Sequence, residues 1–489
     1  MSRRLIGILA LAFALGITCA AYAEVQNVKV SGDITAMYVS RHDFDLSKTT
    51  NYDLSLPNGS NVHQDNVNNF LTIARVRVDA DLTDNVSATF RLINERSWDG
   101  DSNNNSEAKN LDIDLAYVTL KEFLYSPLSL TIGRQELRYG NGLIIGDPDT
   151  NAYSNASSLP TQETDLSYRK AFDAAKAVLN YDPLTVDVIF AKTEEGTVST
   201  NDDTDLYGIN ANYAVNKETT VEGYMFSKVK QSGATQYTAT QRTTNNALTS
   251  TINKHDSVNT IGGRIVNSTI KNLTAQIEAA YQFGKYNPAY DINSPDTRAQ
   301  ADRKAWALQA IATYDLAAIS PEAVSKYKPS IKGGYSFFSG EKSTDTAGDY
   351  HGWDPMYKDQ TIGHVANRIM RTTNMQIFNL SGKVMPMDDV TLTLDYANFN
   401  LNKKYPVSNG VTPALGINTV NLSGRADADT YRMTNKAHLG QEIDATITYD
   451  YTEDVQFNFL GGMFIPGNAF HKDNRTTASE FIGSMKVTF

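Results

Sequence analysis

The connections between the amphipathic segments of this chain alternate between short and long. Alternating apolar and polar residues mark about eighteen segments in the 489 residues. The candidate strands are 28–38, 70–82, 86–95, 111–122, 127–136, 171–181, 184–192, 205–214, 219–229, 258–267, 273–283, 303–315, 328–340, 374–386, 389–400, 439–452, 455–465 and 478–489. Short connections such as Asp182–Pro183 alternate with long polar ones such as 137–170 and 341–373. Sorting of this kind is typical of transmembrane barrels, which have short periplasmic turns and long extracellular loops.

The two faces of the segments support the same fold. In 70–82, Val76 and Val78 alternate with Arg75, Arg77 and Asp79. A charged face that recurs over many strands suits a water-filled lumen better than a packed core. A soluble sandwich has no reason to sort its connections by length, and no fixed repeat of a β-helix is found. The sequence therefore predicts an all-β fold, a transmembrane antiparallel β-barrel of about 18 strands, with a small helix near Ser320-Pro321-Glu322 in the connection 316–327.

The two ends of the chain point to the outer membrane. Residues 1–23 combine a basic start, an apolar run and the small-x-small site Ala21-Tyr22-Ala23, which predicts a cleaved signal peptide. Residues 24–489 then form one barrel domain without Cys19, and therefore without disulfides or thiol chemistry. The last segment alternates up to Phe489 and resembles the terminal signal of outer-membrane barrel proteins. We expect location in the outer membrane of a Gram-negative bacterium, with the lipid bilayer and lipopolysaccharide as partners.

Several function classes find no support in the sequence. The formal net charge of −11 argues against nucleic acid as a partner. The histidines fall in long connections without metal-ligand spacing, and no Gly-x-Ser-x-Gly motif presents a nucleophile. The acidic stretch 99–107 is calcium-like in spacing but lacks the glycine and glutamate placement of an EF-hand, so we interpret it as a solvated loop. We expect no enzyme, no cofactor and no metal site.

The stretch 130–142 breaks the alternation of its segment. Arg134 falls on the same parity as Ile132, and Gly133 between them predicts a bulge that turns Arg134 towards the lumen. The glycine-rich continuation 138–142 either folds into the pore as a constriction or caps it. We expect the constriction.

A set of basic residues lies on or beside the polar faces, together with acidic residues that could hold them in place. The candidate pore-lining and anion-binding residues are Arg75, Arg77, Arg91, Arg134, Arg138, Arg169, Lys176 and Arg264, and the candidate acidic partners are Asp79, Glu95, Glu442 and Asp444. Rings of arginine or lysine in a pore select anions, because a partly desolvated guanidinium binds carboxylate or phosphate. The alternative interpretation is that these residues are salt bridges that satisfy the barrel interior.

One region of the chain carries a family resemblance. Gly133-Arg134-Gln135-Glu136-Leu137-x-Tyr139-Gly140, then Gly146-Asp147, then Arg169-Lys170-x-Phe172-Asp173-Ala174, is similar to the signature of the alginate-export outer-membrane porin family. The resemblance implies a monomeric barrel that passes an anionic exopolysaccharide outward through a narrow arginine-lined pore. It places Arg134 and the Arg169 region at the constriction, with Arg75 and Arg91 beside them. Two positions depart from the family pattern: Leu143 follows Gly142, and Pro148 follows Asp147.

Three functions remain open from the sequence. The first is a channel for passive, anion-selective passage of an alginate-like polysaccharide or of small anions, with periplasmic export proteins as optional partners. The second is a general diffusion porin. The third is a plugged barrel with a structural or surface-binding role.

Overall fold

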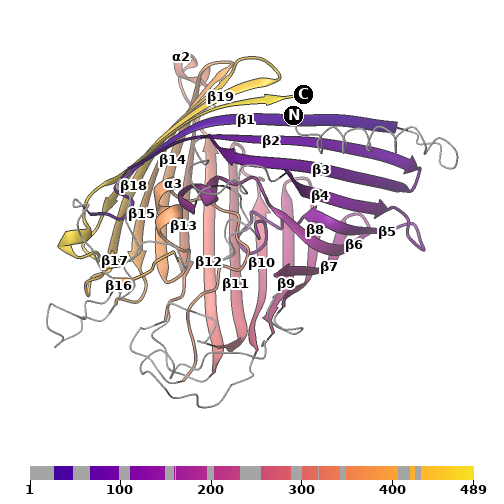
Figure 1. Cartoon of the computed structure of the whole chain (residues 1–489), viewed down its shortest axis with the longest axis horizontal. Coiled ribbons are helices and arrows are strands. Elements are labelled where there is room, and N and C mark those ends of the chain that lie inside the picture. Colours follow the sequence, from indigo (N-terminus) through magenta and orange to yellow (C-terminus); the bar gives the residue numbers. More distant parts are fainter. Residues whose placement is uncertain are drawn as a thin grey trace.

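The barrel is closed. The computed structural model describes residues 27–47, 66–98, 111–148, 159, 161–194, 203–231, 255–287, 300–317, 319–341, 348–405, 419–423 and 431–489. Eighteen antiparallel strands form one sheet in which the last strand pairs with the first (Figure 1). The predicted signal peptide and the acidic stretch 99–107 lie outside the described residues.

The strands pair with their neighbours in chain order. Their bounds are β1 Asn27–His42, β2 Asn66–Thr83, β3 Val86–Ser97, β4 Leu111–Leu120, β5 Leu128–Glu136, β6 Ala171–Asn180, β7 Leu184–Glu194, β8 Thr204–Ala214, β9 Thr219–Lys230, β10 Asp256–Asn267, β11 Leu273–Tyr286, β12 Ala301–Asp315, β13 Ser330–Phe338, β14 Met375–Met387, β15 Val390–Leu401, β18 His438–Asp450, β19 Val455–Pro466 and β20 Ala478–Thr488. A separate two-stranded ladder, β16 Thr419–Val420 with β17 Tyr431–Arg432, lies in the connection between β15 and β18.

The predicted fold is confirmed. Each of the eighteen predicted segments coincides with one barrel strand to within four residues at either end. The predicted helix is present as α2, Glu322–Ser325. Among the helices of the described residues, none has both the length and the apolar character needed to cross a bilayer.

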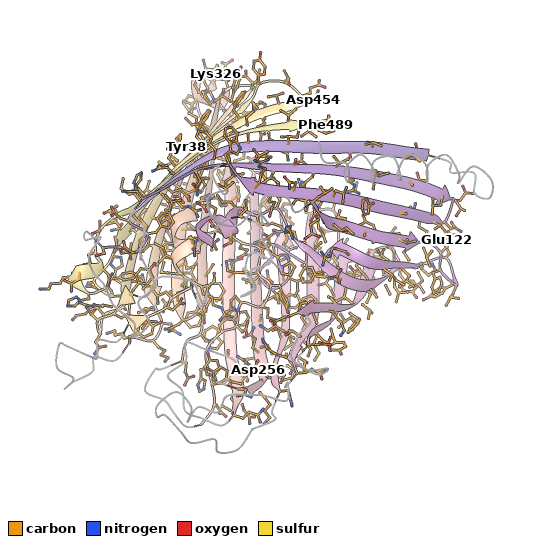
Figure 2. The ribbon with its side chains drawn as sticks, viewed as in Figure 1. Tyr38, Glu122, Asp256, Lys326, Asp454 and Phe489 are labelled. Carbon is orange, nitrogen blue, oxygen red and sulfur yellow. The ribbon has the colours of Figure 1, made fainter. Side chains whose placement is uncertain are left out.

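The alternation of faces explains why these segments become barrel strands. In β12, Ala305 and Ala307 are buried inside the barrel, whereas Lys304 and Trp306 are exposed on the outside. The short connections lie together at one end of the barrel. Lys326 and Asp454, both in short connections, lie near Phe489, whereas Asp256, which follows a long connection, lies at the opposite end (Figure 2). These short connections are the periplasmic turns.

The described residues of two long connections fold into the barrel. We call them loop 5–6, residues 137–170 between β5 and β6, and loop 13–14, residues 339–374 between β13 and β14. They meet at a parallel β-bridge between Ile145 and Tyr357. The Tyr357 N–H donates to the Ile144 carbonyl, and the Asp147 N–H donates to the Tyr357 carbonyl, both at 3.0 Å. The loops are therefore joined through their backbones.

A buried hydrophobic cluster holds the loops against one side of the interior. The loops contribute Leu143, Ile144, Ile145, Trp353, Met356, Tyr357 and the apolar residues of the helix α3, His364–Ile369. We call the part of this cluster that lies on β6–β15 the packed wall; its residues are Phe172, Ala174, Ile189, Ala191, Leu206, Tyr224, Phe226, Val258, Ala280, Ala305, Ala307, Phe338, Met375, Ile377, Ala397, Phe399 and Leu401. Several of them are alanines, and their small side chains leave room for the loops.

A second part of loop 5–6, which includes Leu159, Leu166 and Tyr168, covers the extracellular half of the inner surface across from the packed wall. Leu159, Leu166 and Tyr168 pack on the inner face of β1–β3, whose buried residues there include Leu71 and Ile73. A buried ion pair fixes this segment: Arg41 of β1 donates to both carboxylate oxygens of Asp165, at 2.9 and 2.7 Å.

Candidate functional site

The tip of loop 5–6 contacts side chains on the inner face of β7, β9 and β12, and its role as a constriction stays a prediction. The Tyr139 ring contacts Phe226, and its hydroxyl donates to Asp187 of β7 at 3.0 Å. Asn141 donates to Gln309 of β12 at 2.6 Å. Gly140 adopts φ +57°, and a Cβ there would lie 3.2 Å from the Arg264 guanidinium. A glycine at this position therefore allows the turn to approach the wall closely.

Loop 13–14 is anchored by a buried carboxylate. Asp354 accepts hydrogen bonds from Lys228 of β9 at 2.9 Å and from Arg371 at 3.3 Å. Its backbone N–H donates to Gln282 of β11, which in turn donates to the Asp354 carbonyl. Burial opposes the charge of Asp354, but Lys228 and Arg303 outweigh burial and hold the pKa of this carboxyl below its ordinary value. The anchor therefore carries a full negative charge at neutral pH.

Glu442 and Asp444 do not pair with an arginine in the part of the chain that the structure describes, so this prediction is wrong for both residues. The Glu442 carboxylate accepts the N–H groups of Val365 and Ala366 at 2.7 and 2.8 Å, and Asp444 accepts the His364 N–H at 3.3 Å. The first N–H groups of a helix have no partner within the helix, and these two acids supply acceptors for α3. They hold loop 13–14 in the lumen.

The inner face of β1–β4 carries three of the eight predicted basic residues, on the periplasmic side of Leu71 and Ile73. We call it the charged wall; its residues are Asp33, Arg75, Arg77, Asp79, Arg91 and Asp114. Arg75 pairs with Asp33 across β1 and β2 at 2.9 Å, and its guanidinium lies over the Tyr168 ring. Arg77 pairs with Asp79 at 2.7 Å, and 36% of the Arg77 side chain is exposed. Asp79 thus holds Arg77 on the inner face of β2.

Arg91 completes the charged wall, and Arg169 of loop 5–6 pairs with β4 beside it. Arg91 of β3 lies between Asp114 and Glu136, at 2.5 Å from each. Arg169 pairs with Asp112 at 2.7 Å and lies 3.5 Å from Glu95, the second predicted acidic partner found beside an arginine. Glu95 also accepts the Tyr168 N–H at 2.7 Å. This carboxylate therefore positions the end of loop 5–6 as well as Arg169.

Arg134 lies on the outer face of the barrel, so its predicted position in the lumen is wrong. The register of β5 with β4 and β6 runs without a shift through Gly133, so the predicted bulge at that residue is also absent. Arg134 keeps the parity of the exposed Ile132 and pairs with Asp173 at 2.7 Å. Asp173 alternates with Phe172 and Ala174, which belong to the packed wall, so Asp173 points out of the barrel.

Gly133 is needed for a different reason. Its φ is +123°, and a Cβ there would lie 2.1 Å from the Ala116 carbonyl oxygen of the neighbouring strand. Glycine is the residue that tolerates both constraints. The glycine therefore permits close strand contact and does not re-aim the next side chain.

The three remaining basic residues lie inside the barrel. Arg264 pairs with Glu222 at 2.9 Å below the tip of loop 5–6. Arg138 and Lys170, from the two ends of loop 5–6, both contact the Asp359 carboxylate of loop 13–14. Lys176 of β6 differs from the other predicted cations, because it forms no ion pair within the described ranges. The seven others each have a carboxylate partner.

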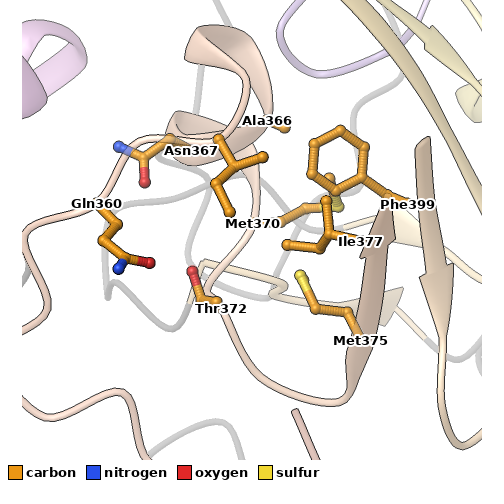
Figure 3. Close-up of a pocket in the computed structure, with 9 residues that line it drawn as sticks. Gln360, Ala366, Asn367, Met370, Thr372, Met375, Ile377 and Phe399 are labelled. Atoms are coloured by element: carbon orange, nitrogen blue, oxygen red, sulfur yellow. The ribbon is translucent and has the colours of Figure 1, made fainter. Parts of the chain in front are cut away.

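A cavity lies between α3 and the packed wall. It is lined by Ala366, Asn367 and Met370 on the loop side and by Met375, Ile377 and Phe399 on the strand side (Figure 3). Its volume is about 20 Å³, which is room for one or two water molecules. This cavity is too small for a solute, so the charged side chains are the better candidate site.

A family model identifies the chain. The model described as Alginate export matches residues 58–484, which is most of the 489-residue sequence. The chain belongs to the alginate export family. No curated protein sequence matches it.

Solved structures that resemble this alginate export family member include outer-membrane porins of Pseudomonas aeruginosa. OccK8 (OprE) superposes with a TM-score of 0.53 at 9% identity, covering 96% of this chain and 99% of that one. OpdQ gives a TM-score of 0.52 at 11% identity, covering 95% and 98%, and OccK3 (OpdO) gives 0.52 at 9% identity, covering 95% and 96%. At such identities the likeness shows the fold. Family and fold together are those of outer-membrane channels, located in the outer membrane of Gram-negative bacteria.

For this family member, the resemblance placed Arg134 and the Arg169 region at the constriction, with Arg75 and Arg91 beside them. Arg75 and Arg91 lie on the charged wall and Arg169 pairs with Asp112 next to it, whereas Arg134 faces outward. Sequence reasoning missed Asp354 and Asp359, which organise loop 13–14. One signal was available: Trp353, Met356 and Tyr357 are large apolar residues in a connection expected to be solvated, and such residues indicate packing.

Proposed function

We propose that this outer-membrane channel passes anionic solutes selectively, either an acidic polysaccharide or small anions. The observation that carries the proposal is the exposure of cations inside the barrel. The side chains of Arg77, Arg138 and Lys170 are 36%, 48% and 38% exposed while each holds a carboxylate. Guanidinium and ammonium groups that water reaches in this way can exchange one carboxylate for another.

The mechanism is passive exchange between cationic positions. A solute carboxylate contacts one arginine while an acidic side chain of the protein releases it, and it then moves to the next cation. Passage requires binding that is strong enough to admit the solute and weak enough to release it. The acidic partners serve this requirement, because they compete with the solute at each position and so keep binding weak.

The alternative is a general diffusion porin with weak selectivity. It is favoured by the carboxylate partners of six of the seven predicted cations that lie inside the barrel, which give the interior a mixed charge. Reversal potentials across a KCl gradient separate the two functions. We expect anion selectivity for the refolded wild-type protein and a chloride-to-potassium permeability ratio reduced about twofold in Arg77→Ala.

Arg134→Ala is the matched control. Both arginines lie on strands, pair with an aspartate and are about equally exposed, at 36% and 37%, but Arg134 lies on the outer face. We expect its permeability ratio to equal that of the wild type. A cation-selective wild-type channel would rule out the anion-selective function and leave the diffusion porin.

A further inference from the structure

The two inward loops share one exposed ion cluster. The Asp359 carboxylate of loop 13–14 accepts from Arg138 on Oδ2 and from Lys170 on Oδ1, and both cations belong to loop 5–6. The side chains of Arg138 and Lys170 are 48% and 38% exposed, and that of Asp359 is 22% exposed. Solvent therefore reaches both cations and the carboxylate between them.

The backbone around the cluster is shaped to receive a carboxylate. A Cβ on Gly142, whose φ is +78°, would lie 2.7 Å from an Arg138 nitrogen, and a Cβ on Gly146 would lie 2.4 Å from the Asp359 Cβ. The glycines thus leave room for the carboxylate and the guanidinium. The Asp359 N–H donates to the Gly142 carbonyl at 2.7 Å, which fixes the backbone of Asp359. The Asp359 side chain can therefore rotate away without separating the loops.

Asp354 of the same loop is a structural anchor and serves as the comparison for Asp359. Its side chain is 12% exposed and is held by Lys228, by Arg371 and by the Met356 N–H. The two cations that contact Asp359 are exposed to solvent, and an ion pair of a solvent-exposed cation is weak and exchangeable. Asp354 and Asp359 thus have different surroundings, and the more exposed carboxylate of the two, that of Asp359, suits exchange.

We propose that Arg138 and Lys170 form a binding site for a solute carboxylate, and that Asp359 is a built-in competitor that occupies this site when no solute is bound. The inference rests on the proposed anionic solute and adds the position of its site and the device that limits its affinity. A bound solute carboxylate takes the place of the Asp359 carboxylate between the two cations. Occupancy by Asp359 reduces the apparent affinity by the fraction of channels in which the site is closed.

The test is block of single-channel current by D-glucuronate, a sugar with one carboxylate, with D-glucose as the neutral comparison. Asp359→Asn keeps the size of the side chain and the backbone N–H that contacts Gly142 but removes the competing charge. We expect its half-blocking concentration of glucuronate to fall roughly fivefold, the factor that corresponds to an exposed ion pair of this kind. Glucose should block neither protein at these concentrations.

Three further variants make the result specific. The double variant Arg138→Gln with Lys170→Gln should raise the half-blocking concentration at least tenfold, since both cations are gone. Asp302→Asn, which removes a carboxylate paired with Lys285 on the outer face, should leave it unchanged. Lys170→Gln alone weakens the block and provides a second reading if Asp359→Asn does not refold.

An unchanged or raised half-blocking concentration in Asp359→Asn overturns the proposal that Asp359 competes with the solute carboxylate. Absence of glucuronate block in both proteins overturns the site itself. Reversal potentials on the same channels separate these failures from failure of the proposed function. If the wild type is anion-selective but Asp359→Asn has the same half-blocking concentration of glucuronate, the proposed channel function is retained and the role of Asp359 as a competitor is rejected.

Discussion

The packed wall and the charged wall are two sides of one barrel interior, and their inward-facing residues differ in charge and in exposure to water. On the packed wall, Ala305 and Ala307 lie under the loops with almost no exposure, at 0% and 1%. On the charged wall, the Arg77 side chain remains 36% exposed and paired with an aspartate. Strands that no loop covers can carry charged side chains, because water solvates these groups and carboxylates pair with them. Side chains beneath a loop must be apolar, or each charged group must be paired. The loops therefore decide which side of the lumen can handle an ionic solute.

The largest expected effect comes from removing the central contact of the packed wall. The Tyr357 ring meets Phe172 edge-on at 5.6 Å, and its hydroxyl lies 2.6 Å from that of Thr193. Tyr357→Ala leaves a cavity between loop and wall, which costs about 4 kcal/mol of loop docking. We expect single-channel conductance to rise at least twofold as the loops loosen.

The control for Tyr357 is Tyr207→Ala, because Tyr207 is 45% exposed on the outer face. It should change neither conductance nor loop docking. An unchanged conductance in Tyr357→Ala would show that the packed loops do not limit the pore, and the contrast between the two walls would lose its functional meaning.

Acid should loosen the same wall through Asp354. The folded protein holds the pKa of Asp354 below its ordinary value of 3.8. The charge of Asp354 therefore stabilises loop docking fully above about pH 4, and this contribution is lost as the pH falls through 3.8 towards the lower folded pKa. We expect wild-type conductance to be constant from pH 7 to about pH 4 and to rise below that.

Asp354→Asn should lack this acid response. Because it leaves Lys228 and Arg371 without their carboxylate, it should lower loop docking by about 3 kcal/mol at neutral pH. Its conductance at pH 7 should resemble that of the wild type at pH 3. An acid response that persists in Asp354→Asn would assign the titration to another group.

A smaller effect is expected on the charged wall. Arg91→Gln leaves Asp114, whose side chain is 1% exposed, without its charged partner. We expect a loss of about 2 kcal/mol of barrel stability, measured as a lower temperature of heat-induced unfolding. The conductance should change little, since the loops remain docked. A rise as large as that of Tyr357→Ala would show that the charged wall also holds the loops.

The smallest effect should come from Lys176, which lacks an ion-pair partner in the described part of the barrel. Lys176→Gln should alter the free energy of unfolding by less than about 0.5 kcal/mol, because no carboxylate is left unpaired. A slight fall in anion selectivity, measured as the reversal potential, is the expected outcome. A marked loss of stability would reveal an undetected structural role.

The sequence by itself determined the barrel. Eighteen strands, their bounds and the sorting of turns and loops follow from alternation and connection length, which are local properties of the chain. The inner position of Arg75 and Arg77 and the pairing of Arg77 with Asp79 follow from the same parity. For Arg134 the parity with Ile132 also indicated the outer face, and the inferred bulge at Gly133 led away from it.

Only the tertiary structure decided how the lumen is filled. Arg138 and Asp359 are separated by 221 positions and lie in irregular loops, where no periodicity reports contact. Glu442 and Asp444 have the alternation of pore residues, yet they bind the first N–H groups of α3 because a buried helix end needs acceptors. Local sequence therefore fixes the strands, while contacts between distant loops fix which side chains water and solute can reach.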